Sequence, residues 1–290
     1  MSETVRVFVF CTAVFTAGIA GSQGGAAVQK GASPQMEQKE DSAQTPALKD
    51  LTIKVLHDNY PYAEGLKTAW GFSALVTGAE KTILFDTGSD GALLLLENMA
   101  KLKVEPNAVD IVVLSHVHGD HTGGLTGFLS RNPRVQVFLV KSFPQRFRDA
   151  VCGCGATVVE VEQPRQICAN VYTTGLMGKL VKEQALVVRT RRGLVILTGC
   201  AHPGVTQMVD RAAGMFEQDE VFLVMGGFHL EWATTRRIEK IIAAFERHAV
   251  RYAAPTHCSG DNARKLFSQH FDDRYIEVGV GKTVTLSELE

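Results

Sequence analysis

Histidine is the residue type whose placement in this chain points most directly to chemistry. Three of the nine histidines lie together with one carboxylate in the six residues HVHGDH, numbered 116–121. Imidazole nitrogens and carboxylate oxygens are ligands that zinc and similar divalent metals take in proteins. His116 and His118, two residues apart on a curving loop, can therefore point at one metal ion. Asp120 and His121, just beyond the glycine, can face a second ion a few ångströms away.

Four histidines follow the ends of predicted strands. These are His116, His202, His229 and His257, each two to five residues beyond an apolar run. In layered α/β folds the loops that leave strand ends converge on a shared cleft. We therefore expect these distant segments to bring their side chains together. His248 and His270 lie on or at the ends of predicted helices, where a solvated or capping role is expected.

The elements that must position these side chains are short apolar runs alternating with amphipathic stretches. The runs predict strands at residues 51–56, 72–76, 82–85, 111–114, 135–139, 158–161, 185–189, 194–197, 221–224, 251–254 and 274–278. Their β-branched and aromatic residues favour strand over helix. Helices are predicted at residues 92–101, 124–130, 206–216, 235–248 and 263–270. Because strands outnumber helices about two to one, we expect an α/β (α+β) fold of two sheets packed face to face with helices outside.

The composition excludes some kinds of partner. Of 290 residues, 45% are hydrophobic and 8% aromatic, and 30 basic side chains stand against 31 acidic ones. Binding nucleic acid through its phosphates requires a basic excess, which this chain lacks. Disordered chains carry fewer apolar and aromatic residues than this one. We therefore expect a folded protein with a small-molecule substrate and no nucleic-acid partner. The sequence does not indicate an oligomeric state.

The first 49 residues differ from the rest. Val7–Ala20 is almost wholly apolar, follows Arg6 and precedes small residues, which is the layout of a secretory signal peptide. These fourteen residues fall short of the ~20 that a membrane-spanning helix needs, so no stable membrane span is expected after cleavage. The stretch that follows is rich in Gly, Ser, Gln and charge, which predicts a flexible linker.

The predicted organisation is a signal peptide at residues 1–25, a flexible linker at residues 26–49 and a catalytic domain at residues 50–290. Such a chain would be exported to the periplasm or secreted, and a cytoplasmic location is the alternative. Five cysteines remain after cleavage: Cys152, Cys154, Cys168, Cys200 and Cys258. An odd number leaves at least one free thiol or metal ligand. A disulfide from Cys152 or Cys154 to Cys168 is left open.

The histidine-rich segment resembles the His-x-His-x-Asp-His signature of the metallo-β-lactamase superfamily. An apolar strand ending at Leu114-Ser115 precedes it, and Thr122-Gly-Gly124 follows it. The segment Leu84-Phe-Asp86-Thr-Gly88 is similar to the strand-ending aspartate turn of that superfamily. The resemblance covers roughly residues 50–290. It implies a four-layer αββα sandwich of two mixed sheets, with a site for one or two divalent ions, Zn²⁺ above all, at one edge.

Later motifs are similar to the subgroup named for ribofuranosylaminobenzene-phosphate synthase, a pterin-pathway activity. They are Thr198-Gly-Cys-Ala-His202, Gly226-Gly-Phe-His229 and Pro255-Thr-His257. The resemblance implies that His202 joins His116 and His118 on the first ion. It also implies that His257 joins Asp120 and His121 on the second. Cys200 stands where many members have a bridging aspartate, and three roles remain open for it: bridging the ions, binding one, or binding neither.

Other side chains near the predicted centre have roles beside metal binding. Asp86 is expected to orient a histidine or hold the loop rather than to bind the metal itself. His229 is a candidate proton donor or substrate contact, and the alternative is a histidine hydrogen-bonded in the cleft wall. The segment after His57-Asp58 contains Tyr60, Tyr62 and Trp70. It either lines a substrate entrance or forms an ordinary aromatic-anchored loop.

These residues lead to the hypothesis of a metal-dependent hydrolase. A divalent metal held by neutral imidazoles lowers the pKa of bound water from 15.7 to about 7. The resulting hydroxide would attack an ester, phosphoester or lactone, with Asp120 steering it and His229 protonating the leaving group. One alternative is a synthase-like transferase of the pterin pathway, with the metal as Lewis acid. A second is a metal-binding or sensory module without turnover.

Overall fold

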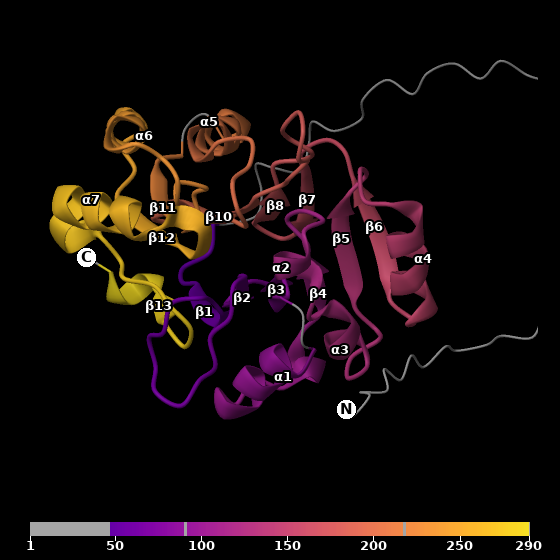
Figure 1. Cartoon of the computed structure of the whole chain (residues 1–290). Coiled ribbons are helices and arrows are strands. Elements are labelled where there is room, and N and C mark those ends of the chain that lie inside the picture. The colour runs from indigo at the N-terminus through magenta and orange to yellow at the C-terminus, as the bar shows by residue number, and fades with distance from the viewer. Residues whose placement is uncertain (1–46, 90–91, 217–218, 290) are drawn as a thin grey trace, which may run out of the picture. The chain divides into compact units, whose positions relative to one another are not determined.

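Runs of β-branched residues build two mixed sheets, which a computed structural model of the whole chain shows in Figure 1. The structure describes residues 47–89, 92–216 and 219–289, and all of them belong to one unit, residues 44–290. The predicted signal peptide and most of the predicted linker, residues 1–46, lie outside the described residues. Within the described ranges, no helix is both long enough and apolar enough to cross a membrane.

The first sheet has seven strands within the described residues, in the order β13-β1-β2-β3-β4-β5-β6. Their bounds are β1 Thr52–His57, β2 Ser73–Thr77, β3 Ile83–Phe85, β4 Ile111–Val113, β5 Gln136–Val140, β6 Thr157–Val161 and β13 Thr283–Thr285. Strands β3 to β6 run parallel to one another, whereas β13, β1, β2 and β3 pair antiparallel.

The second sheet has six described strands in the order β12-β11-β10-β9-β8-β7. Their bounds are β7 Arg165–Cys168, β8 Val171–Thr173, β9 Leu186–Thr190, β10 Gly193–Thr198, β11 Val221–Gly227 and β12 Tyr252–Thr256. Strands β10, β11 and β12 are parallel, and β9 pairs antiparallel with β10 across a tight turn in which Thr190 lies opposite Gly193.

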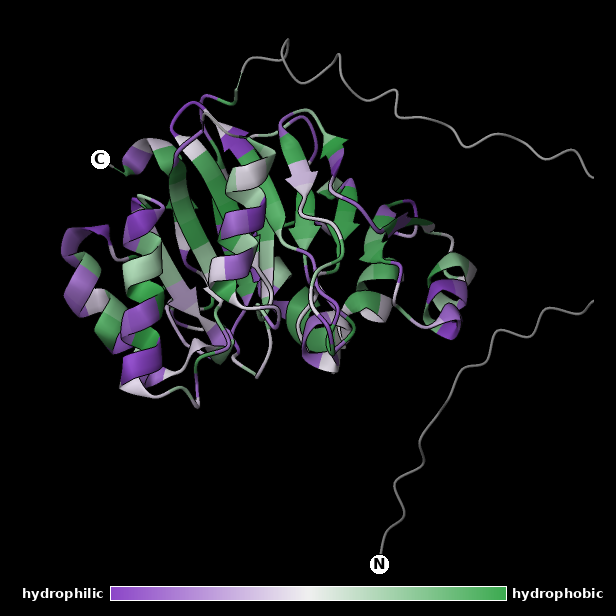
Figure 2. Cartoon of the chain, turned by 90° about the horizontal axis from the view of Figure 1, so that it is seen from above, coloured by the Kyte–Doolittle hydropathy of each residue, from purple (hydrophilic) through white to green (hydrophobic). Residues whose placement is uncertain are grey.

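Helices cover the outer faces of both sheets. The α-helices of the described residues are α1 Ala92–Lys101, α2 Gly119–Thr122, α3 Leu125–Leu129, α4 Gln145–Gly153, α5 Val205–Met215, α6 Thr235–Arg247 and α7 Asp261–Phe271. Figure 1 shows α5, α6 and α7 beside β10–β12, and α1, α3 and α4 beside the first sheet. In Figure 2 the strands are mostly hydrophobic, while hydrophilic and hydrophobic residues alternate along the covering helices.

Strand periodicity explains the four layers. In β10, Val195 and Leu197 lie in the core between the two sheets, together with Ile53 and Phe85 of the first sheet. Their neighbours on the strand face the opposite way and pack under the helices α5, α6 and α7, because successive side chains on a strand point to opposite faces. A third core lies between the first sheet and α1, α3 and α4. The predicted αββα sandwich is confirmed.

Most predicted elements are found, and the errors have physical reasons. Residues 274–278 form no strand, and the prediction there was wrong. Tyr275 makes only an isolated bridge to Ala253. The alternation that suggested a strand arises because Ile276 and Val278 are buried in the core between the sheets without a hydrogen-bonded ladder.

The elements that the sequence analysis missed are short or polar. Strands β7, β8 and β13 are three or four residues long and helix α4 is nine. Half of β7 is exposed and only Val151 of α4 is buried, so neither presents the clear apolar period that marks a strand or a helix. The metal-ligand loop was also expected to be irregular, yet Gly119–Thr122 forms one helical turn, α2.

Candidate metal centre

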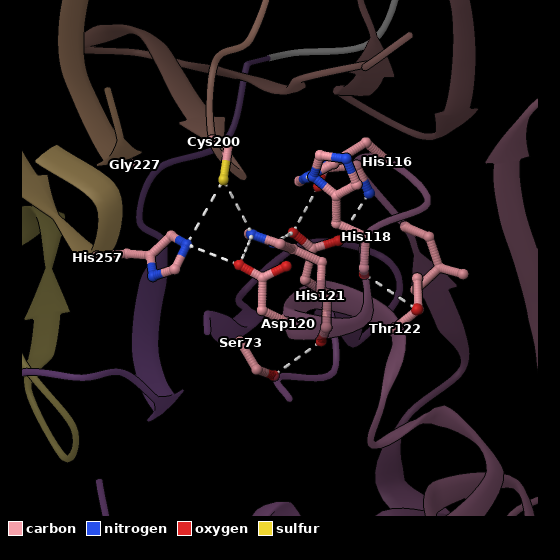
Figure 3. Close-up of polar contacts among 12 residues, drawn as sticks. Ser73, His116, His118, Asp120, His121, Thr122, Cys200, Gly227 and His257 are labelled. Carbon is pink, nitrogen blue, oxygen red and sulfur yellow. Dashed lines mark hydrogen bonds and ion pairs between the residues drawn. The ribbon is translucent and has the colours of Figure 1, made fainter. Parts of the chain in front are cut away.

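Parallel strands end at the same edge of the structure, and the predicted site residues follow those ends. Strand β4 is followed by His116, and β10 by Cys200 and His202. Strands β11 and β12 are followed by His229 and His257. The first sheet and the second sheet thus supply donors to one centre, seen in Figure 3.

The first donor group consists of His116, His118 and His202. The ring of His116 lies 4.7 Å from that of His118 and 4.8 Å from that of His202, between centroids. The rings of His118 and His202 are 4.9 Å apart. Nε2 of His202 is buried and has no hydrogen-bond partner among the described residues. A buried nitrogen without a partner is costly, and a cation between these rings would satisfy it.

The second donor group consists of Asp120, His121 and His257. Oδ2 of Asp120 lies 3.5 Å from Nε2 of His121 and 3.4 Å from Nε2 of His257. Figure 3 shows these three side chains turned toward one another and toward Cys200. Together with the Cys200 sulfur, their donor atoms all lie within 4.8 Å of one another.

Cys200 lies within reach of both groups. Its Sγ is 3.2 Å from Nε2 of His121 and 3.5 Å from Nε2 of His257. The same sulfur forms a set with His116 and His202, again with donor atoms within 4.8 Å of one another. The thiol is therefore a candidate donor for either group.

The outer nitrogens of three candidate ligand histidines have fixed partners. Nδ1 of His121 lies 2.7 Å from Oδ2 of Asp86, and Nδ1 of His257 lies 2.9 Å from Oδ1 of Asn59. Nδ1 of His116 lies 2.9 Å from Oγ of Ser115. Metal-binding histidines are usually held in this way, which sets the tautomer and leaves Nε2 facing the ion. Asp86 thus contacts a ligand histidine and does not itself face the donor groups.

Burial and crowding keep two of the imidazoles neutral. Burial, followed by the neighbouring His121, His202 and His118, holds the pKa of His116 far below its usual range. Burial and the nearby His229 lower the pKa of His202 to about 4. Neutral imidazole is the form that binds metal, so both rings are ready as ligands at neutral pH.

The pKa values of Asp120 and His121 shift in the directions that favour the charged forms of these two side chains. Burial alone would raise the pKa of Asp120, but its hydrogen bonds to His121 and His257 hold the pKa well below the usual range. Burial would lower the pKa of His121, but Asp86 and Asp120 raise it to about 10. The ring of His121 lies between two carboxylates, with Nδ1 near Asp86 and Nε2 near Asp120. Positive charge at Nε2 is therefore favoured, and either a proton or a metal ion can supply it.

The chemistry of the donors fits a divalent metal. Two adjoining sets of nitrogen, oxygen and sulfur atoms, some buried and some partly exposed, have three outer nitrogens fixed and one inner nitrogen without a partner, which matches what zinc-like ions require. The imidazoles of the first and last motifs also meet, since the rings of His121 and His257 are 5.0 Å apart between centroids.

His229 stands beside the first donor group. Its ring is exposed and lies 4.4 Å from that of His202 between centroids. Its hydrogen bond to Cys258 raises its pKa, against the effect of burial. The structure thus places His229 at the mouth of the site, where one of its ring nitrogens also lies within 4.8 Å of the sulfurs of Cys200 and Cys258.

The three aromatic residues that were candidates to line a substrate entrance make contacts with different parts of the structure. Trp70 lies against His257, with ring centroids 4.8 Å apart. Tyr60 instead donates to Asp261 at the start of α7, and Tyr62 accepts a hydrogen bond from Lys282. Only Trp70 of these three contacts a donor histidine within the described contacts.

Sequence reasoning missed Glu183. This carboxylate is fully buried and accepts the backbone N–H groups of Cys200, Ala201 and His202 at 2.8–2.9 Å. It therefore holds the loop that carries two donors, and burial raises its pKa to about 7. The signal available in the sequence was an acidic residue shortly before the apolar strand β9, which begins at Leu186.

Ser115, Asn59 and Cys258 were also missed as neighbours of the centre. Ser115 and Asn59 fix ligand histidines, as described above. Sγ of Cys258 lies 3.6 Å from the Cys200 carbonyl oxygen, to which it donates. Short polar residues of this kind carry no periodic signal. The described cysteines are all free, including Cys152, Cys154 and Cys168.

Comparison with known proteins agrees with this geometry. The family model of the metallo-beta-lactamase superfamily matches residues 71–141, which span Asp86 and the histidine-rich segment. A relative in Methanocaldococcus jannaschii, 7,8-dihydropterin-6-methyl-4-(beta-D-ribofuranosyl)-aminobenzene-5'-phosphate synthase, is 26% identical over 81% of this chain and 96% of its own length.

Solved structures show the same fold. Tm1679, described as a metal-dependent hydrolase of the beta-lactamase superfamily, superposes with a TM-score of 0.68 at 29% identity, covering 81% of this chain and 98% of its own. YhfI from Bacillus subtilis, a metallo-beta-lactamase fold protein, gives a TM-score of 0.59 at 12% identity, covering 82% and 100%. At that low identity the second likeness concerns the fold alone.

Proposed function

Since this chain belongs to the metallo-β-lactamase superfamily, we propose that it is a metal-dependent hydrolase of a small ester, phosphoester or lactone. The observation that supports this most strongly is the pair of adjoining donor groups built from both sheets. Zn²⁺ is the proposed metal, because imidazole, carboxylate and thiolate together suit it.

In this proposal, His116, His118 and His202 hold one ion, and Asp120, His121 and His257 hold the other. Cys200, within reach of both groups, is proposed as a shared ligand. When bound, such ions supply Lewis acidity and make water a nucleophile near neutral pH.

The chain's own residues then have separate tasks. Asp120 stays ionised because His121 and His257 hydrogen-bond to its carboxylate, so it can accept a hydrogen bond from the attacking water and orient it. His229 is exposed at the mouth of the site, and its contact with Cys258 favours its protonated form. It can therefore give a proton to the leaving group.

The test combines metal analysis with an activity screen on esters, phosphodiesters and lactones. Wild type should hold divalent metal and turn over at least one substrate class. Asp120→Ala should lower both metal content and turnover. His229→Ala should keep the metal and lose about 10²–10⁴-fold in turnover, the usual contribution of general acid catalysis. His270→Ala is the matched control, because His270 pairs with Glu246 on the helical surface.

Each outcome has a distinct meaning. Unchanged turnover in His229→Ala removes the proton-donor role but leaves the hydrolase proposal standing. Tight metal binding without turnover on any substrate class would favour a non-catalytic metal-binding or sensory module instead.

A transferase is the second candidate function. It is favoured by the relative in Methanocaldococcus jannaschii, a synthase by name, which this chain matches over 96% of that protein's length. The assay offers the purified protein a phosphoribosyl donor with an aromatic acid and follows the coupled product by mass spectrometry. Coupling without hydrolysis of any ester, phosphodiester or lactone would replace the hydrolase proposal.

The proposed location is outside the cytoplasm, with residues 1–25 as a removed signal peptide and residues 50–290 as the catalytic domain. Expression in a Gram-negative host, followed by mass spectrometry of the N-terminal peptide in the periplasmic fraction, tests this. We expect a mature chain that starts close to residue 26. An intact N-terminus in the cytoplasmic fraction would contradict export and strengthen the transferase candidate, because phosphoribosyl donors are cytoplasmic.

A further inference from the structure

A cavity opens directly beside the first donor group. Its volume is about 380 Å³, and its walls include His202, His229, the first turn of α5 and one face of α6. Sites for small molecules commonly have volumes of about 300–1,000 Å³. The cavity is therefore large enough for part of a small substrate whose other part reaches the donor histidines.

The face of α6 that lines the cavity is basic. Arg237, Lys240 and Arg247 all contribute to its wall. Their spacing of three and seven residues places them on one side of the helix, while Ile238, Ile242 and Phe245 on the other side are buried. The three cations are thus not required for packing against the sheet.

These positive charges have little compensation nearby. Across residues 47–89, 92–216 and 219–289, no ion pair involves Arg237, Lys240 or Arg247. The acidic side chain among the lining residues is Asp210 of α5, and its Oδ1 lies 2.6 Å from Nε2 of His248. Three cations therefore line the cavity against one carboxylate that already has a partner.

The part of the wall formed by the start of α5 also suits an anion. Helix α5 begins at Val205 after Gly204, and both residues line the cavity together with Thr206 and Gln207. The N-terminus of a helix carries partial positive charge. This contribution adds to the basic face of α6 rather than standing alone.

We propose that this cavity binds a phosphate monoester group of the substrate while the reacting bond lies at the donor histidines. The assignment rests on the proposed function, since it names the class of substrate for that same centre. Arginine and lysine side chains form charge-assisted hydrogen bonds to phosphate oxygens, and a dianionic group matches the uncompensated charge. His202, shared by the cavity wall and the first donor group, connects the two parts of the site.

The first experiment measures binding of inorganic phosphate to the full-length, metal-loaded protein by isothermal titration calorimetry. The test variant is Arg237→Gln with Lys240→Gln, and the matched control is Arg236→Gln. Arg236 is exposed on the same helix but is absent from the cavity wall. Glutamine preserves helix propensity, and metal content is measured for each protein.

We expect the double variant to bind phosphate about tenfold more weakly, as charge-assisted contacts are lost, and the control to match wild type. Phosphate held by the metal ions alone would bind all three proteins equally and would overturn the assignment. Equal weakening in Arg236→Gln would also overturn it, because the effect would then be one of overall surface charge.

A second measurement separates this assignment from the proposed function. For wild type and the double variant, kcat/KM is compared between an ester that carries a phosphate monoester group and a neutral ester. We expect the ratio of the two values to fall about tenfold in the double variant, and an unchanged ratio would contradict the assignment. If neither ester is hydrolysed but the double variant binds phosphate more weakly, the hydrolase proposal fails and the phosphate site stands.

Discussion

At the scale of single residues, the candidate centre depends on side chains that contact the outer nitrogens of its histidines. Asp86, Asn59 and Ser115 each contact Nδ1 of a ligand histidine. Each contact leaves Nε2 as the nitrogen that faces the donor groups. Such outer partners orient the ring and raise its basicity, so in a metal-loaded chain they would contribute to metal affinity without touching the ion.

Asp86→Asn should weaken metal binding. The amide keeps the shape of the carboxylate but loses its charge and one acceptor oxygen, so His121 is held less firmly. We expect about a 10–100-fold loss of metal affinity, which is typical for such partners, measured by competition with a chromophoric chelator. Asp110→Asn is the control, because Asp110 accepts the N–H of Thr82 on the surface. Equal affinity in both variants would contradict an orienting role for Asp86.

Asp58 should make stability depend on pH. Burial raises its pKa from 3.8 to about 6, although Thr256 and the backbone of Tyr60 donate hydrogen bonds to it. Between these values the folded chain holds a proton that the unfolded chain has lost. The free energy of unfolding therefore falls as the pH rises from about 4 to about 6.

Asp58→Asn should remove this contribution, which is at most about 3 kcal/mol for a shift of this size. Urea denaturation of both proteins at pH 4, 5 and 6 measures it, and subtraction cancels the other titrating groups. Parallel pH dependences for wild type and variant would show that Asp58 does not titrate in this range.

At the scale of elements, the site requires strand ends that approach one another very closely. Gly226 at the end of β11 has a φ of +125°, and a Cβ added there would overlap the carbonyl oxygen of Thr198 in β10. A Cβ on Gly199 would overlap Oγ of Ser115, which follows β4 of the first sheet. Glycine at these positions lets the backbone segments that carry Cys200 and His116 come together.

Gly226→Ala should therefore be strongly destabilising. Both the positive φ and the overlap with backbone act against alanine, and we expect a loss of at least about 2 kcal/mol in the free energy of unfolding. Gly214→Ala is the control, because a Cβ there meets nothing within 4 Å and α5 continues through the position. Alanine should stabilise that helix by about 0.5–1 kcal/mol. Urea denaturation distinguishes the two, and similar effects would contradict the close-approach argument.

At the scale of the whole folded unit, the candidate metal centre lies between the two sheets and takes side chains from both. His116 follows β4 of the first sheet, and His202 and His257 follow β10 and β12 of the second. Ions held between them would bind the folded chain and not the unfolded one, which stabilises the fold by mass action.

Removal of metal should accordingly lower the melting temperature. At a free metal concentration of 100 times Kd the stabilisation is about 2.7 kcal/mol, or about 5–10 °C for a domain of this size. Differential scanning calorimetry with and without a chelator measures the shift. A variant that lacks one donor in each group, His116→Ala with His257→Ala, should show little change on chelation. A large chelator effect in that variant would mean that the stabilising ions bind elsewhere.

The layered fold and most of the candidate donors are readable from the sequence, because both leave local patterns. Periodic burial marked ten strands and five helices at close to their observed positions, and the dense cluster at residues 116–121 marked the metal chemistry. The apolar period wrongly predicted a strand at residues 274–278, where buried side chains alternate without a ladder of backbone hydrogen bonds. It also missed polar elements such as α4.

The tertiary structure decided how these parts meet. For three of the histidines, the nitrogen that faces the centre depends on Asp86, Asn59 and Ser115, two of which come from segments far from the histidines they hold. The position of Cys200 between both donor groups, the carboxylate of Glu183 beneath its loop and the basic cavity beside His202 are likewise contacts between distant segments. Such contacts have no fixed sequence spacing, because they are set by the packing of two sheets against each other. The sequence alone determines which atoms can bind a metal, and the packing determines where those atoms converge.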